Sequence, residues 1–102
     1  ESRHLLQSCT FWVELDSDVA QVQALLVAAA LGTEQVLADP APLALLAEVA
    51  PQGLRFTLNF WMDDPVHGQS LTRSRVNIAV LQAMRASGVV MAKTTQEVVL
   101  RR

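Results

Sequence analysis

The sequence predicts an α+β domain of the ferredoxin-like class, with the element order β-α-β-β-α-β. Alternation of apolar and polar residues over Leu54–Phe60, continued by Trp61 and Met62, indicates a half-buried strand. Two segments with helical periodicity are each followed by a glycine, Gly32 and Gly88. The compact arrangement of this order is a four-stranded antiparallel sheet in the spatial order 4-1-3-2, with both helices on one face.

The composition indicates one folded domain and excludes several classes. The chain has 102 residues, of which 51% are hydrophobic and 18% charged, with a net charge of −2. This balance does not favour a nucleic-acid or anionic-lipid partner. Cys9 is the only cysteine, so an intrachain disulfide is excluded. The longest uncharged apolar run, Val19–Gly32, is shorter than the roughly 20 residues that span a bilayer. Since the chain starts without methionine, we expect a fragment of a longer protein.

The first strand is predicted at residues 8–15, and its alternation separates two faces. Cys9, Phe11, Val13 and Leu15 share the face that is expected to lie against the helices, and Thr10, Trp12 and Glu14 share the other. Ser17 is the expected N-cap of a helix over residues 17–31. The apolar stripe of this helix comprises Val22, Leu25, Leu26 and Ala29.

The middle of the chain is predicted to be a loop followed by a β-hairpin. Pro40 and Pro42 exclude a helix. The run 43–50 is ambiguous by propensity, but it is short and bounded by prolines, so we interpret it as the second strand. Pro51-Gln52-Gly53 turns the chain into the third strand, at 54–62.

The last two elements are a helix over residues 70–87 and a strand over residues 96–100. One stripe of the helix is apolar and comprises Val76, Ala79, Val80, Ala83 and Met84. Ile78 and Leu81 fall on nearly the opposite side, without a predicted partner inside the domain. We therefore consider them candidate contacts with another subunit or domain, against the alternative that isolated exposed apolar residues are ordinary.

The strands 8–15 and 54–62 are expected to be central neighbours, which leaves one face of the sheet open. Trp12 and Trp61 project from this open face together with Arg55. RNA-binding domains of similar topology stack bases on aromatic residues from these two strands. The acidic balance opposes that function, so we favour burial of Trp12 and Trp61 in a subunit or domain contact.

Asp63, Asp64 and His67 form the densest group of chemically active side chains. They are at most a partial metal-ligand set, and Asp-Asp-Pro followed by a glycine is typical of a turn. We therefore interpret Phe60–Gly68 as the end of a strand. Cys9 lies in an apolar alternation and is expected to be a small buried residue rather than a nucleophile.

Further catalytic patterns are not found in the sequence. The serines lack a nucleophile-elbow context, and the four glycines form neither GxGxxG nor a P-loop. An acylphosphatase-like hydrolase would need a phosphate-binding arginine after the first strand, where Asp16-Ser17-Asp18 stands instead. We expect a non-catalytic protein with no cofactor and no metal.

Four segments in order resemble the C-terminal α/β domain of small-conductance mechanosensitive channels, the MscS family. They are the helix start at 16–18, the Val-Leu-x-Asp-Pro-x-Pro segment at 36–42, the Trp-x-Asp strand end at 61–63, and the Ser-x-x-Asn helix at 74–77 with its cap at 87–89. The resemblance covers roughly residues 11–100. Two positions depart from the family pattern. Residues 91–96 replace a Pro-Phe-Pro-Gln-like stretch, and Leu81 stands where a polar residue is expected.

The resemblance implies a cytoplasmic cage domain of a channel that releases solutes under membrane tension during hypo-osmotic shock. Members of the family lie in the bacterial inner membrane, form cages that are typically heptameric, and carry their β and transmembrane domains upstream. Identical subunits are the implied partners, and the isolated fragment is expected to be a monomer or dimer. The alternative is a stand-alone ferredoxin-like module, which would bind nucleic acid on Trp12 and Trp61 or sense a small ligand at a dimer interface.

Overall fold

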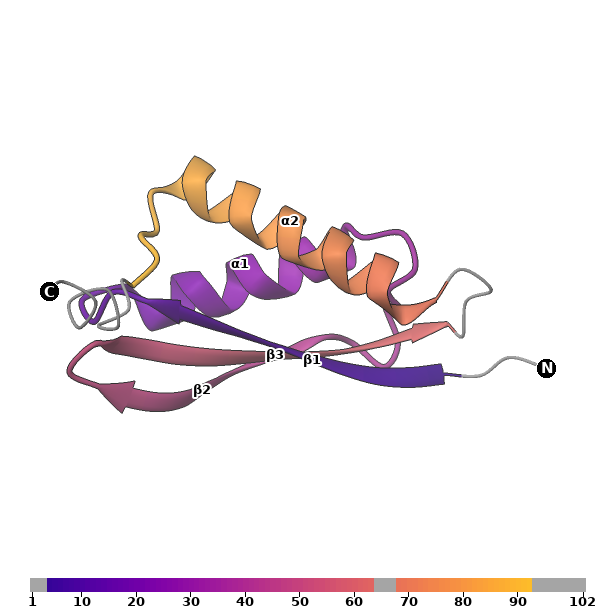
Figure 1. Cartoon of the computed structure of the whole chain (residues 1–102), viewed down its shortest axis with the longest axis horizontal. Helices are drawn as coiled ribbons and strands as arrows, with labels where there is room; N and C mark the ends of the chain where they lie inside the picture. Colours follow the sequence, from indigo (N-terminus) through magenta and orange to yellow (C-terminus); the bar gives the residue numbers. More distant parts are fainter. Residues whose placement is uncertain (1–3, 64–67, 93–102) are drawn as a thin grey trace, which may run out of the picture.

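The computed structural model describes residues 4–63 and 68–92, and it confirms the α+β class. Two helices cover one face of a three-stranded sheet (Figure 1). The elements in order are β1 (His4–Val13), α1 (Val19–Leu31), β2 (Leu43–Ala50), β3 (Gly53–Asp63) and α2 (Gln69–Ser87). The ambiguous run 43–50 is therefore a strand, as predicted.

The sheet has the order β1-β3-β2, and both of its strand pairs are antiparallel. Phe56 of β3 lies opposite Phe11 of β1 and Leu46 of β2, which fixes the register of all three strands. The second pair is interrupted by a β-bulge between Leu46 and Glu48 that the sequence pattern did not indicate. The expected fourth strand, 96–100, lies outside the described residues, so the four-stranded ferredoxin-like order remains a prediction.

Strand β1 differs from its predicted bounds at both ends. It begins at His4 rather than Ser8, so that Leu5 and Leu6 pair with Met62 and Trp61. It ends at Val13, and Leu15 is 50% exposed instead of facing the helices. The prediction for Leu15 was wrong because the chain leaves the sheet after Val13, where the period-two alternation no longer applies.

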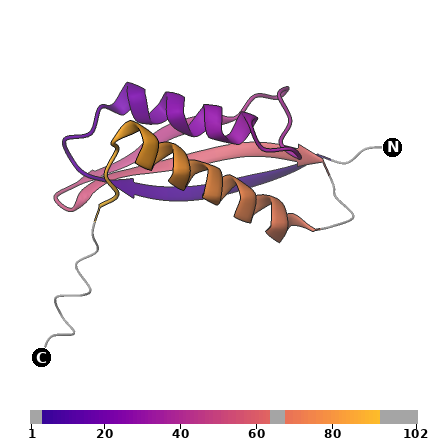
Figure 2. The same cartoon turned by 90° about the horizontal axis from the view of Figure 1, so that it is seen from above.

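The helices lie side by side over the sheet, with α1 against β2 and β3 and α2 against β1 (Figure 2). Asp18, not Ser17, is the N-cap of α1, because its carboxylate accepts a hydrogen bond from the backbone N–H of Gln21. Gly88 ends α2 in the left-handed conformation, and the N–H of Val89 reaches the carbonyl of Met84.

The core lies between the helices and the helix-facing side of the sheet. Strand β3 contributes five consecutive alternate residues, all at most 4% exposed: Leu54, Phe56, Leu58, Phe60 and Met62. Cys9, Phe11 and Val13 of β1 lie in the same cluster. The helices complete it with Val22, Leu26 and Ala30 of α1 and Val76, Val80 and Met84 of α2. The predicted helix-facing alternation of β3 is confirmed.

The chain after α2 returns to the outer edge of β1. The backbone N–H of Glu14 donates to the carbonyl of Val90, and the N–H of Ala92 donates to the carbonyl of Trp12, both at 3.0 Å. Val13 and Met91 form the antiparallel bridge between these two bonds. The hairpin turn between β2 and β3 packs closely against the end of β1. A Cβ added to Gly53 would lie only 2.4 Å from the carbonyl oxygen of Val13.

Candidate functional site

The candidate contact residues lie on two surfaces that the described chain leaves uncovered: the open face of the sheet and the outer side of α2. Trp12 and Trp61 are half-buried, and both project from the open face, as predicted. Ile78 and Leu81 are 52% and 38% exposed on α2. Whether these four residues contact another subunit or domain remains a prediction.

The two tryptophans do not form a joint platform. Trp61 lies opposite Leu6, whereas Trp12 lies opposite Arg55. Leu6 and Trp12 are six residues apart on β1, which is roughly 20 Å in an extended strand. Successive bases could not stack on both rings at once, so the geometry does not support the base-stacking alternative.

Arg55, the basic residue expected beside the tryptophans, is paired with an acidic neighbour. Its Nε donates to Oε1 of Glu48 at 3.1 Å across the β2–β3 pair. The β-bulge after Leu46 brings Glu48 opposite Arg55. This ion pair reduces the positive potential of the open face near Trp12, which further weakens the case for binding a phosphate backbone.

The open face is apolar at one end and along one edge, with a polar centre. Leu6 and Trp61 form a cross-strand apolar pair at one end. Leu43 and Leu45 are 53% and 44% exposed on the edge strand β2, opposite Asn59 and Thr57. The centre carries polar residues, and the hydroxyl of Ser8 donates to Oδ1 of Asn59 at 2.6 Å.

Sequence reasoning missed three members of this surface: Leu6, Leu43 and Leu45. Leu6 was missed because the first strand was predicted to start at Ser8. The spacing of two residues that places Leu6 on the same face as Ser8, Thr10 and Trp12 is nevertheless visible in the sequence. Leu43 and Leu45 alternate with the buried Ala44 in β2. Extending the period-two pattern of the first strand back to His4, and applying the same pattern within residues 43–50, would have found all three.

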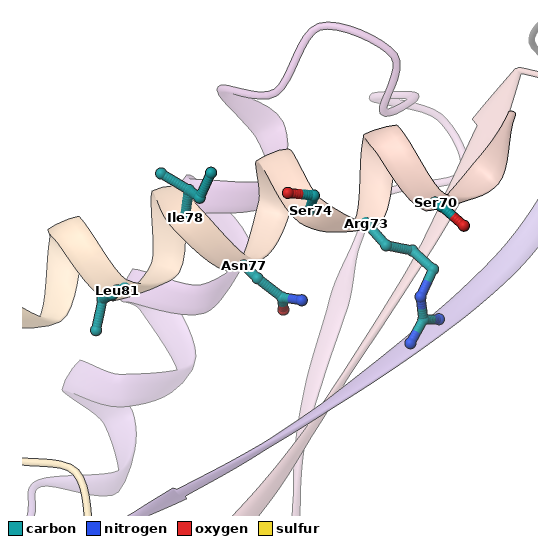
Figure 3. Close-up of a pocket in the computed structure, with 6 residues that line it drawn as sticks. All are labelled: Ser70, Arg73, Ser74, Asn77, Ile78 and Leu81. Atoms are coloured by element: carbon teal, nitrogen blue, oxygen red, sulfur yellow. The ribbon is translucent and has the colours of Figure 1, made fainter. Parts of the chain in front are cut away.

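The outer side of α2 carries a shallow polar and apolar hollow. It is lined by Ser70, Arg73, Ser74, Asn77, Ile78 and Leu81 (Figure 3). Figure 3 shows Ile78 pointing away from the sheet and Arg73 extending from the helix toward β1. Leu71, also on α2, is exposed as well. The exposed apolar surface of α2 therefore includes Leu71 in addition to the two predicted residues, Ile78 and Leu81.

The group around Asp63 is described only in part. Residues 64–67, which include Asp64 and His67, lie outside the described residues. Asp63 is exposed at the end of β3 opposite His4, whose Nε2 lies 3.9 Å from its Oδ1. The sequence did not place His4 here, because the two residues are far apart along the chain. Within residues 4–63 and 68–92, no three potential ligands gather into a metal site.

Cys9 is buried beneath α2, as predicted. Burial raises the pKa of its thiol, and the nearby Arg73 guanidinium lowers it by a smaller amount. The thiol is therefore protonated at neutral pH and poorly suited to act as a nucleophile.

Neither helix in the described part of the chain is long and apolar enough to cross a membrane.

A comparison with curated protein sequences returned no match. A family model described as the C-terminal region of the mechanosensitive ion channel MscS matches residues 8–91.

Two solved structures share the fold. The closed state of Helicobacter pylori MscS has a TM-score of 0.76 at 17% identity, over 92% of this chain and 36% of that one. Arabidopsis thaliana MSL1 has a TM-score of 0.70 at 14% identity, over 91% of this chain and 34% of that one. The chain thus spans about a third of the length of either protein. Because the family model covers most of the sequence, the chain belongs to the MscS family of mechanosensitive ion channels and corresponds to its C-terminal domain.

Proposed function

We propose that this domain is part of the cytoplasmic cage of a mechanosensitive channel that opens under membrane tension and releases solutes during hypo-osmotic shock. The match of the MscS C-terminal model to residues 8–91 carries this proposal. The whole channel would lie in the bacterial inner membrane, with this domain on the cytoplasmic side. Its β and transmembrane domains would lie upstream of this domain in the full-length protein.

The uncovered surfaces support a role in assembly. The exposed apolar residues lie on two different sides of the domain, on the open sheet face and on α2. Ring assembly needs two different surfaces on each subunit, because each subunit contacts two neighbours. Identical subunits and the upstream domains are therefore the proposed partners, with a heptamer as the expected ring.

A non-catalytic role without a cofactor is also proposed. The described residues offer a protonated, buried Cys9 and an exposed His4–Asp63 pair. Neither combines a nucleophile with a base in a recess, which acyl or phosphoryl transfer would need.

The decisive experiment uses the full-length gene product in bacterial cells that lack mechanosensitive channels. We expect it to restore survival after hypo-osmotic shock and to give tension-activated currents in membrane patches. A full-length protein without tension-activated current, in cells where it is present in the membrane, would contradict the proposed function.

The proposed contact surface is tested in the same protein. Trp61→Ala is expected to reduce the fraction of complete rings, measured by light scattering after solubilisation, because Trp61 and Leu6 form the apolar end of the open face. Thr57→Ala is the matched control, since Thr57 lies in the polar centre of the same strand. Equal ring fractions in the two variants would exclude the open face near Trp61 as a contact.

The isolated 102-residue chain is expected to be a monomer or dimer in solution, because it spans only about a third of the length of the matched channels and would hold only part of the ring interface. Light scattering that shows a stable heptamer would disprove this. Quenching of tryptophan fluorescence by single-stranded RNA at moderate salt would instead support the base-stacking alternative.

A further inference from the structure

Helix α2 carries most of the positive charge of the described chain. Three of the four arginines within residues 4–63 and 68–92 lie on this helix, which contains no acidic residue. Arg73 is directed toward β1, where it donates to the carbonyl of Ser8. Arg75 and Arg85 are exposed, and neither pairs with a carboxylate in the described part of the chain. The helix is therefore basic on a domain whose whole sequence has a net charge of −2.

The same side of α2 is apolar between these two arginines. Ile78 and Leu81 are 52% and 38% exposed. Spacings of three, three and four residues place Arg75, Ile78, Leu81 and Arg85 on one side of the helix. The two arginines lie about 15 Å apart along its axis. We call these four residues the α2 patch, an apolar pair with one positive charge on either side.

The connection between β1 and α1 has the complementary pattern. Leu15 is 50% exposed, and it lies between the exposed residues Glu14 and Asp16. Neither carboxylate forms an ion pair within the described residues. Figure 2 shows this connection at one end of the domain. The chain thus presents an apolar side chain with one negative charge on either side.

Backbone hydrogen bonds hold this connection in place. The N–H of Ser17 donates to the carbonyl of Glu14 at 3.1 Å, as in a β-turn with Leu15 and Asp16 at its tip. The N–H of Glu14 donates to the carbonyl of Val90 at 3.0 Å, which anchors the turn to the segment after α2. Because the turn is already ordered, little conformational entropy would be lost when it binds a partner.

We infer that the turn at residues 14–16 of one copy of the chain docks on the α2 patch of a second copy. Leu15 then lies against Ile78 and Leu81, and the two carboxylates lie toward the arginines. Opposite charges at matching places favour the correct partner and the correct register. A second copy is the occupant that fits, because the same chain carries both the basic patch and the acidic turn.

The contact is heterologous, since the turn and the α2 patch are different surfaces. A contact of this type closes into a ring when the rotation between neighbours allows it. The inference rests on the proposed function and names the two surfaces by which identical subunits would meet.

The test is a charge exchange in the full-length protein, with complete rings measured by light scattering after solubilisation. Reversing the arginines with Arg75→Glu and Arg85→Glu should lower the fraction of complete rings at least about twofold, because like charges across a contact repel. Reversing the carboxylates with Glu14→Arg and Asp16→Arg should have the same effect. All four substitutions together should restore the rings, since opposite charges meet again.

A matched control moves the same charges elsewhere. Asp39 and Asp63 are exposed carboxylates outside the turn, and Asp63 lies beside the opposite end of β1. Asp39→Arg with Asp63→Arg should leave the ring fraction unchanged. Added to the variant with reversed arginines, this pair should not restore the rings.

Cysteine cross-linking tests the apolar part of the contact directly. Leu15→Cys with Ile78→Cys should give a ladder of disulfide-linked subunits in the full-length protein under a mild oxidant. Leu15→Cys with Leu43→Cys is the control, because Leu43 is 53% exposed on a different surface, and it should give no ladder.

Three results would overturn the inference. The first is an unchanged ring fraction when the arginines are reversed. The second is a loss of rings that the charge exchange does not restore, which would assign the α2 patch to another acidic partner. The third is the absence of a ladder from Leu15→Cys with Ile78→Cys. In each case the unmodified protein would still give tension-activated current, whereas failure of the proposed function would remove that current.

Discussion

The two faces of strand β3 differ in how far the rest of the described chain buries their side chains. On the helix-facing side, the alternate residues from Leu54 to Met62 are almost fully buried by α1, α2 and the neighbouring strands. On the open side, Arg55, Thr57, Asn59 and Trp61 are only partly buried, by cross-strand neighbours. The described chain alone buries one face of the strand, and it leaves the other face partly exposed to solvent.

This difference separates residues that determine folding from residues available for assembly. Apolar burial of about 25 cal/mol per Å² stabilises the fold on the helix-facing side. The open face has apolar side chains at the Leu6–Trp61 end and along β2, around a polar centre. Substitutions on the two faces should therefore affect different measurements.

The largest expected effect comes from adjacent residues on opposite faces. Phe56→Ala should lower the free energy of unfolding by about 3–5 kcal/mol, because it leaves a cavity at the centre of the core. Thr57→Ala should change it by no more than about 0.5 kcal/mol. Urea denaturation of both variants measures the difference. Similar losses would mean that the open face also contributes to the core.

The next effect concerns the hairpin that joins the edge strand to β3. Gly53 has φ 150°, and an added Cβ would collide with the backbone of Val13. Gly53→Ala should therefore cost about 1–3 kcal/mol of stability. Gly88→Ala is the control, because Gly88 has φ 80° but open space around it, and it should cost about 1 kcal/mol. Thermal denaturation of both variants would show whether the collision adds to the backbone strain.

On the open face, Trp61→Ala should have a small effect on the isolated chain. Its cross-strand contact with Leu6 is worth at most about 1 kcal/mol. The loss of complete rings in the full-length protein should be the larger consequence. Urea denaturation of the isolated variant checks the first value, and a loss comparable with that of Phe56→Ala would show that Trp61 belongs to the core.

The smallest effect is a pH dependence on the helix-facing side. Because the pKa of Cys9 is raised in the folded state, the folded thiol keeps its proton when the unfolded one has lost it. The buried, protonated thiol therefore contributes to the free energy of unfolding. This contribution is complete below the ordinary thiol pKa of about 8.5, and it is lost as the pH rises through the pKa of Cys9 in the folded state. Unfolding measured at several pH values should show this decline in the unmodified chain. Cys9→Ala should lack it, and an unchanged slope would exclude Cys9 as its source.

The sequence was sufficient for the elements whose pattern is local. The alternation in β3, the stripes of both helices and the exposed Ile78 and Leu81 follow from spacings of two, three and four residues. The N-cap was misplaced by one residue, because Ser17 and Asp18 are both good caps and only the hydrogen bond to Gln21 distinguishes them. The β-bulge at Leu46 was missed for a similar reason, since it depends on the pairing partner.

The arrangement of the site could be predicted only in part. The face of each tryptophan follows from alternation, but the distance between the tryptophans depends on the β1–β3 register. That register also brings Leu6 to Trp61 and His4 to Asp63. Register is set by packing between distant segments rather than by the local pattern, so these pairs could not be read from spacing alone.

The pairing of β1 with β3 also has a consequence for how quickly the domain folds. The β2–β3 pair is a hairpin closed over a short turn at Gly53, whereas β1 joins residues 4–13 to residues 54–63. Closing the longer loop costs more chain entropy, and contacts between distant residues slow folding. The hairpin should therefore form before β1 docks, and the rate of folding should depend mainly on the step in which the first strand reaches the third.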